Sequence, residues 1–164
     1  ADAVHSAVVK HAFAFKDGTI EMKVKFSEES DVLRVNLCDY NEKSVHAGHL
    51  ANSIIETKRV TLADAKTGMM NLNIQAARKN KTLSDEQKQE LRSKSKEIPY
   101  QVSLNQWHQV YVTVSGDRIS CTIDDQEVGS FRSPGIAHET KTWIRLLVLG
   151  SVCIDDVRFW RKSH

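Results

Sequence analysis

The chain has 164 residues, of which 40% are hydrophobic and 27% are charged, and this balance is typical of a globular domain with its own core. The formal net charge of +2 excludes a global field that would draw the protein to nucleic acid. No apolar run approaches the ~20 residues of a membrane span. We therefore expect a single domain over residues 1–164, with no nucleic-acid partner and no membrane span.

Alternating apolar and polar residues predict strands through the first third of the chain. Segment 20–26 alternates strictly, with Glu21, Lys23 and Lys25 on one face, and segment 11–15 alternates before it. Because Asp17-Gly18 lies between these two runs, we expect them to form a hairpin.

The next segments continue the strand pattern. Residues 31–38 place Leu33, Val35 and Leu37 on one face, and Arg34 and Asn36 on the other. Residues 44–50, with His46 and a bend near Gly48, and residues 53–62 are expected to be two further strands.

Between about residues 63 and 98 the period changes to that of helices. Apolar residues recur at helical spacing from Met69, and Ser84 with Gln87 forms a capping box that opens a second helix. Seven basic residues and three acidic ones lie between positions 78 and 96, which favours a solvated helical face over an anionic partner site. We expect a helical insertion here.

After Pro99 the strand pattern returns, with runs at 107–114, 119–123, 128–131, 143–149 and 152–160 separated by turn residues. Many short strands at regular spacing predict an all-β fold, a two-sheet antiparallel sandwich with the helical insertion. Three cysteines, Cys38, Cys121 and Cys153, each lie in a strand-like run. Buried free thiols are favoured, and one disulfide plus one free thiol is the alternative.

The last third of the chain also carries a family resemblance. Trp107-His108, Gly116-Asp117, Ile123-Asp124 and the final strand at 154–160 resemble a laminin-G or concanavalin-A-like jelly roll. The stretch 133–141 (SPGIAHETK), together with 11–21, is similar more narrowly to the keto-disaccharide hydrolase family of planctomycete-type bacteria.

This resemblance implies a carbohydrate or cell-surface polysaccharide ligand and a secreted, periplasmic or cell-surface location, with a signal peptide removed before Ala1. It does not carry over a catalytic set of residues. The Glu-x-Asp-x-x-Glu strand of jelly-roll glucanases, which places two carboxylates on one face, is absent.

In a jelly roll one sheet is concave, so its outward side chains line a groove. Sugar hydroxyls need donors and acceptors at fixed positions. The alternative is that the candidates are merely solvent-facing strand and loop residues. The candidate groove residues are Arg34, Asn36, Asp39, His46, His49, His138 and Lys141.

Aromatic side chains are the second ingredient of many sugar sites. Tyr40 and Tyr111 are the candidates for stacking on a sugar ring. Trp107, Trp143 and Trp160 each adjoin an apolar strand, so we expect them to pack in the core or at an edge.

We expect no metal and no other cofactor, with calcium as the alternative left open. His46 and His49 point to opposite faces if they lie on a strand, and a metal site would need a bend at Gly48. Asp155 and Asp156 are adjacent, so on a strand they cannot both face one calcium ion.

The sequence predicts an exported carbohydrate-binding or cell-surface interaction module. Two alternatives stay open: a glycoside hydrolase of the keto-disaccharide type, and a structural domain of a larger surface protein.

Overall fold

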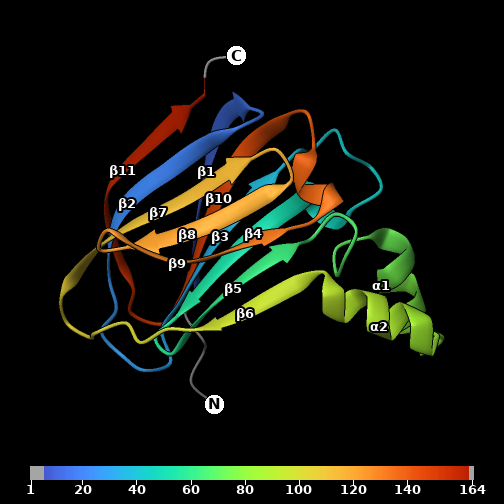
Figure 1. The fold of residues 1–164 in the computed structure, drawn as a ribbon, viewed down its shortest axis with the longest axis horizontal. Coiled ribbons are helices and arrows are strands. Elements are labelled where there is room, and N and C mark those ends of the chain that lie inside the picture. Colours follow the sequence, from blue (N-terminus) through green and yellow to red (C-terminus); the bar gives the residue numbers. More distant parts are fainter. Residues whose placement is uncertain (1–5, 163–164) are drawn as a thin grey trace.

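The computed structural model describes residues 6–162, and it shows two antiparallel β-sheets packed face to face (Figure 1). Sheet A has the strand order β1 (Ser6–Phe15), β10 (Lys141–Leu149), β3 (Val32–Cys38), β4 (His49–Glu56), β5 (Arg59–Asp64), β6 (Ser95–Pro99). Sheet B has the order β11 (Cys153–Arg161), β2 (Gly18–Lys25), β7 (Trp107–Ser115), β8 (Arg118–Ile123), β9 (Gln126–Arg132). The predicted all-β sandwich is confirmed.

The core lies between the two sheets and follows the alternation in the sequence. On sheet B, Met22 lies opposite Val110, which lies opposite Ile123, and all three side chains are buried. On sheet A, Leu33, Val35 and Leu37 of β3 point toward them and are also buried. Burying each side chain of this kind contributes about 1.5–3 kcal/mol, and it fixes which face of every strand is left for function.

The expected hairpin between residues 11–15 and 20–26 is wrong, because β1 belongs to sheet A and β2 to sheet B. Asp17-Gly18 carries the chain from one sheet to the other. Asp17 accepts a hydrogen bond from Gly116 N at 2.9 Å, and a Cβ on Gly18 would lie 2.4 Å from the Trp160 carbonyl oxygen. The glycine therefore serves a close approach of two chain segments rather than a tight turn.

The expected strand at 44–50 is largely replaced by the 3-10 turn η1 (His46–Gly48), and β4 begins at His49. Gly48 has φ +70°, and its carbonyl accepts a hydrogen bond from Asp39 N at 2.8 Å. The expected strand at 53–62 is two strands, β4 and β5, which turn at residues 57–58.

Two short helices occupy the middle of the predicted insertion, α1 (Leu72–Lys79) and α2 (Asp85–Ser93), and they lie together beyond one end of the sheets (Figure 1). The capping box of Ser84 and Gln87 is confirmed. The end of the segment is not helical, because β6 pairs with β5 as the edge of sheet A. Neither helix in the described part of the chain is long and apolar enough to cross a membrane.

All three cysteines are free thiols. Cys38 and Cys121 are buried, as expected, whereas Cys153 is exposed at the start of β11. Burial raises the pKa of Cys38 to about 11 and that of Cys121 to about 12, so both stay protonated.

Candidate functional site

The outward face of sheet A is hollowed by a groove of about 570 Å³. Its polar lining residues are Lys10, Arg34, Asn36, Tyr40, His46, His49, Asn52 and Arg145. Its apolar lining residues are Val8, Ala47, Ile54, Met70 and Leu147. We call this hollow the sheet-A groove.

The register of the strands sets one polar row across the floor of the sheet-A groove. Lys10 of β1 lies opposite Arg145 of β10, Arg145 opposite Asn36 of β3, and Asn36 opposite Asn52 of β4. Since these residues lie on the face turned away from the core, four neighbouring strands present four polar side chains side by side.

The charge in the sheet-A groove has one sign. Lys10, Arg34 and Arg145 line it, and within residues 6–162 none of the three forms an ion pair with a carboxylate. No aspartate or glutamate is among the described residues that line the hollow. Lys10 Nζ lies 5.7 Å above the ring of Tyr40, so the aromatic face is its neighbour instead.

Two buried polar side chains complete the site. His49 is 7% exposed, and burial, followed by the nearby charges of Arg145 and His46, lowers its pKa to about 4. His49 is therefore neutral at pH 7. Asn52 is 9% exposed and lies beside His49, whose lowered pKa is partly offset by a contact with the Asn52 side chain. The Oδ1 atom of Asn52 is itself buried, so a ligand would meet only the part of the amide that borders the groove.

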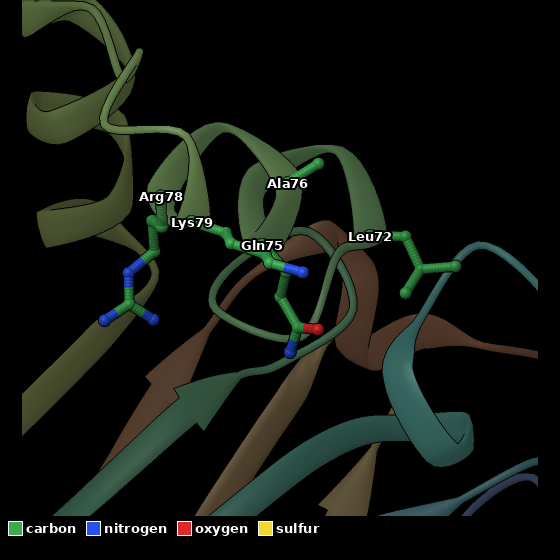
Figure 2. Close-up of a pocket in the computed structure, with 5 residues that line it drawn as sticks. All are labelled: Leu72, Gln75, Ala76, Arg78 and Lys79. Carbon is green, nitrogen blue, oxygen red and sulfur yellow. The ribbon is translucent and has the colours of Figure 1, made fainter.

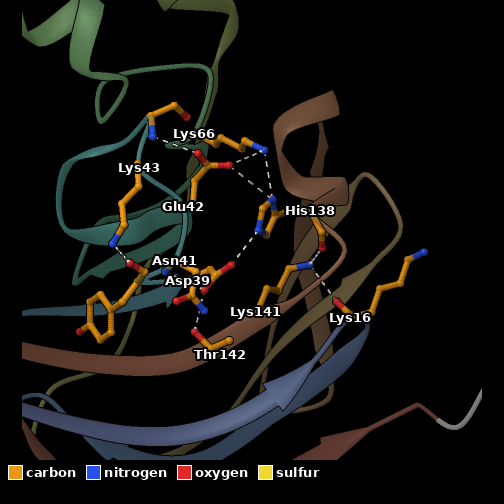
Figure 3. Close-up of polar contacts among 11 residues, drawn as sticks. Lys16, Asp39, Asn41, Glu42, Lys43, Lys66, His138, Lys141 and Thr142 are labelled. Carbon is orange, nitrogen blue, oxygen red and sulfur yellow. Dashed lines mark hydrogen bonds and ion pairs between the residues drawn. The ribbon is translucent and has the colours of Figure 1, made fainter.

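Asp39 and His138 do not line the sheet-A groove but form a separate polar cluster (Figure 3). His138 Nε2 lies 3.2 Å from Asp39 Oδ2, and its Nδ1 lies 3.0 Å from Lys66 Nζ. Because an ammonium can only donate, Nδ1 accepts and the neutral ring donates from Nε2 to Asp39. The cluster joins the loop after β3 to the segment before β10.

The carboxylates of this cluster are held ionised by hydrogen bonds. Burial would raise the pKa of Asp39, yet donors from Asn41 N, His138 and Thr142 bring it below its ordinary value. Hydrogen bonds from Ser44 and then Lys66 lower the pKa of Glu42 to about 2. Both acids already have partners, so the cluster orders loops beside the groove, among them the one that carries Tyr40.

Lys141 is also outside the sheet-A groove, because its side chain is fully buried. Its Nζ donates to the carbonyl oxygens of Lys16 at 2.8 Å and His138 at 2.9 Å (Figure 3). Burial lowers its pKa to about 8. Lys141 therefore ties two loops together from inside.

The structure thus brings Arg34, Asn36, His46 and His49 into one groove and leaves Asp39, His138 and Lys141 outside it. Sequence reasoning missed Lys10, Asn52 and Arg145. The last two could have been noticed, since Arg145 is the one charged residue in the apolar run 143–149 and Asn52 interrupts another.

The expected place of the tryptophans is the core or an edge, and only Trp107, on the central strand β7, differs from this, whereas Trp160 lies on the edge strand β11. Trp107 is 47% and Trp160 is 56% exposed, and both lie on the outward face of sheet B with half-buried Tyr111. Trp143 is half-buried and its ring centroid lies 5.5 Å from that of Tyr40. Tyr40 is therefore the stacking candidate that borders the sheet-A groove.

A hollow of about 650 Å³ beside α1 is a weaker candidate (Figure 2). Its five described lining residues all come from that one helix, and none of them is buried. The one polar lining group with hydrogen bonds, the Gln75 amide, already donates to Met69 and Met70, so this open surface is poorly suited to selecting a ligand.

No group of three or more His, Cys, Asp or Glu among residues 6–162 is arranged to hold a metal ion. Asp156 has φ +51° and pairs with Arg158 at 3.0 Å, while Asp155 accepts a hydrogen bond from Asp156 N. The two carboxylates are therefore engaged separately.

Comparison with known proteins supplies the family. The laminin G domain matches residues 51–159, which is more than half of the chain. The chain belongs to the laminin G domain family. A comparison with curated proteins gives no significant match to this laminin G domain.

Solved structures share the fold at low identity. The carbohydrate-binding module CBM66 of Bacillus subtilis has a TM-score of 0.57 and 9% identity, with 97% of this chain and 84% of that one covered. Sheep galectin-11 has a TM-score of 0.55 and 10% sequence identity, with 90% of this chain and 96% of the galectin covered. The Caenorhabditis elegans galectin LEC-6 has a TM-score of 0.54 and 10% sequence identity, with 100% of this chain and 93% of the galectin covered. At such identities the likeness shows the jelly-roll fold of this laminin G domain.

Proposed function

We propose that this laminin G domain is a carbohydrate-binding module whose site is the sheet-A groove. The observation that carries the proposal is the row of polar side chains that the strand register sets across the floor of the groove. The volume of about 570 Å³ lies within the range of small-ligand sites. One neighbour in fold is by name a carbohydrate-binding module.

In this proposal the groove binds a glycan and does not hydrolyse it. Glycosidases of the common types need two carboxyl groups flanking the scissile bond. The described lining of the groove offers none, and Asp39 and Glu42 are engaged in their own cluster. The narrower likeness to keto-disaccharide hydrolases stays a prediction, as does the exported location that a glycan ligand would suit.

The experiment is a glycan-array screen followed by calorimetric titration of the best binder. We expect Asn36→Ala and Asn52→Ala each to weaken binding about fivefold to tenfold, the loss expected for one hydrogen bond. Gln109→Ala, which removes an amide from the outward face of sheet B, is the matched control and should change nothing.

Thermal unfolding of each variant verifies that the fold is retained. Two results would overturn the proposal: no glycan binds the wild-type protein, or binding survives both asparagine substitutions unchanged.

A further inference from the structure

The edge strands of the two sheets are β1 and β11 at one side of the sandwich and β6 and β9 at the other (Figure 1). The side formed by β6 and β9 is closed. A Cβ on Gly129 would lie 2.7 Å from Ile98 Cδ1, so the two strands are packed together there. Lys96 Nζ donates to the Ser130 carbonyl at 3.3 Å, and Pro99 removes a backbone donor from β6. Such features keep an edge strand from pairing with another chain.

The side formed by β1 and β11 is open. All seven residues of Ser6–Ala12 are exposed, although this stretch pairs with β10. Val9 is 63% and Val157 is 37% exposed, and both border an apolar hollow of about 200 Å³ that β1, β10 and β11 line. Lys10 is the one permanently charged residue of the stretch, and its ammonium is turned inward over the ring of Tyr40, which follows β3. An apolar edge strand of this kind is a template for a further strand.

The regular part of β1 is complementary to itself. Ser6–Ala12 pairs with β10 without interruption and the register shifts only beyond it, so Val9 is the midpoint of the regular strand. An axis at Lys10 would set two lysines directly opposite each other, which destabilises a sheet, whereas an axis at Val9 sets no like charges opposite. The facing pairs about Val9 are Val9 with Val9, Val8 with Lys10 and Ala7 with His11 of the second copy.

We propose that the protein forms a homodimer in which two β1 strands pair antiparallel about a twofold axis at Val9 and join the two A sheets into one. The seven facing pairs of Ser6–Ala12 add about six to eight backbone hydrogen bonds. The two Val9 side chains, exposed in the single chain, are buried against each other. This isologous contact closes on itself, so assembly stops at the dimer.

The dimer has a consequence for the site. Because residues that face each other across the axis lie on the same face of the joined sheet, both sheet-A grooves open in the same direction. A ligand with repeating units can therefore engage two grooves at once. Only this consequence rests on the proposed function.

Analytical ultracentrifugation of the purified chain tests the dimer without any ligand. We expect a reversible dimer with a dissociation constant in the micromolar range, since one strand pair gives a small interface. Val9→Lys sets two cations opposite each other at the axis and should raise the dissociation constant about tenfold or more. Leu72→Lys makes the same change at an exposed apolar position of α1 and should match wild type. Thermal unfolding verifies that each variant is folded.

Cysteine substitutions then test the register, in a Cys153→Ser background that leaves only the buried thiols of Cys38 and Cys121. Val9→Cys places two thiols directly opposite, with the Cα atoms about 4.5–5.5 Å apart, so mild oxidation should yield a covalent dimer. Ala7→Cys is the matched control. Its two thiols lie four residues apart along the strands, at about 13 Å, which is too far for a disulfide.

Any of three results would overturn the dimer. The wild-type protein stays monomeric at millimolar concentration, Val9→Lys leaves the dissociation constant unchanged, or the cysteine at position 7 crosslinks as readily as the one at position 9. None of these measurements uses a saccharide. Failure of the glycan screen would therefore overturn the proposed function and leave the dimer standing, and a monomeric protein that binds a glycan would do the reverse.

Discussion

The outward faces of the two sheets both carry charged side chains but arrange them differently. On sheet B several charges have a partner of opposite sign, and Lys25 lies over the ring of Trp107. Lys23 lies 3.7 Å from Asp156, and Arg118 lies 2.5 Å from Glu127. Glu21 accepts hydrogen bonds from the Gln109 amide and the Trp160 indole. The polar side chains of this face are thus paired with one another and need no ligand.

On the outward face of sheet A, Arg59 pairs with Glu56 and Glu97, but the charges that line the groove have no such partners among the described residues. Lys10 and Arg145 face each other across the register, and no carboxylate is among the described lining residues. The alternation of apolar and polar residues in the sequence assigns each side chain to one face of a sheet. Whether the polar side chains of that face pair with one another then distinguishes a solvated face from a binding face. A polar row that its own fold does not satisfy is the better indicator of a ligand.

The largest effect that we expect is a loss of folding stability at low pH. The pKa of His49 is about 4 in the fold against a usual 6.5, because of burial and then the charges of Arg145 and His46. The unfolded chain therefore binds a proton first as the pH falls, so stability conferred by neutral His49 is present above pH 6.5 and is lost toward pH 4. The full loss amounts to about 3 kcal/mol.

Urea unfolding at a series of pH values measures this loss, with His49→Gln as the comparison. The variant cannot be protonated at this position, so its stability should fall less between pH 6.5 and pH 4. Curves that stay parallel for wild type and variant would mean that His49 lacks the lowered pKa that burial, and then the charges of Arg145 and His46, give it.

A smaller effect of opposite direction is expected at Lys10. Lys10→Glu replaces a like-charge pair with an opposite-charge pair facing Arg145 and should stabilise the free protein by about 0.5 kcal/mol in urea unfolding. The same change should weaken glycan binding, because Lys10 lines the groove. Lys23→Glu on sheet B, next to Asp156, should instead destabilise the protein slightly and leave binding intact. Destabilisation by Lys10→Glu would contradict the account.

The sequence predicts the faces well because alternation depends on neighbours two positions apart. It correctly places Leu33 inward and Arg34 outward. It cannot place Arg145 beside Asn36, since that contact depends on β10 lying next to β3 although more than a hundred residues separate them. Strand order is a property of the whole fold, and the polar row of the groove follows from it.

Local patterns fail where tertiary contacts decide. Asp17-Gly18 is typical of a hairpin, but here it crosses between sheets because Gly18 must pass close to the Trp160 carbonyl. Lys141 looks like a surface cation in a loop, yet it lies opposite Phe15 in sheet A and is buried. Nothing within a few residues of either position carries that information.

The central claim is that the ligand lies on the outward face of sheet A. The most direct measurement is a titration of isotopically labelled protein with the glycan that binds best in the array, followed by amide and side-chain chemical shifts in NMR. We predict that the largest shifts fall on Arg34, Asn36, Asn52 and Arg145, with Lys23, Gln109 and Trp160 unmoved. Shifts centred on the sheet-B residues, with the sheet-A groove silent, would contradict the account.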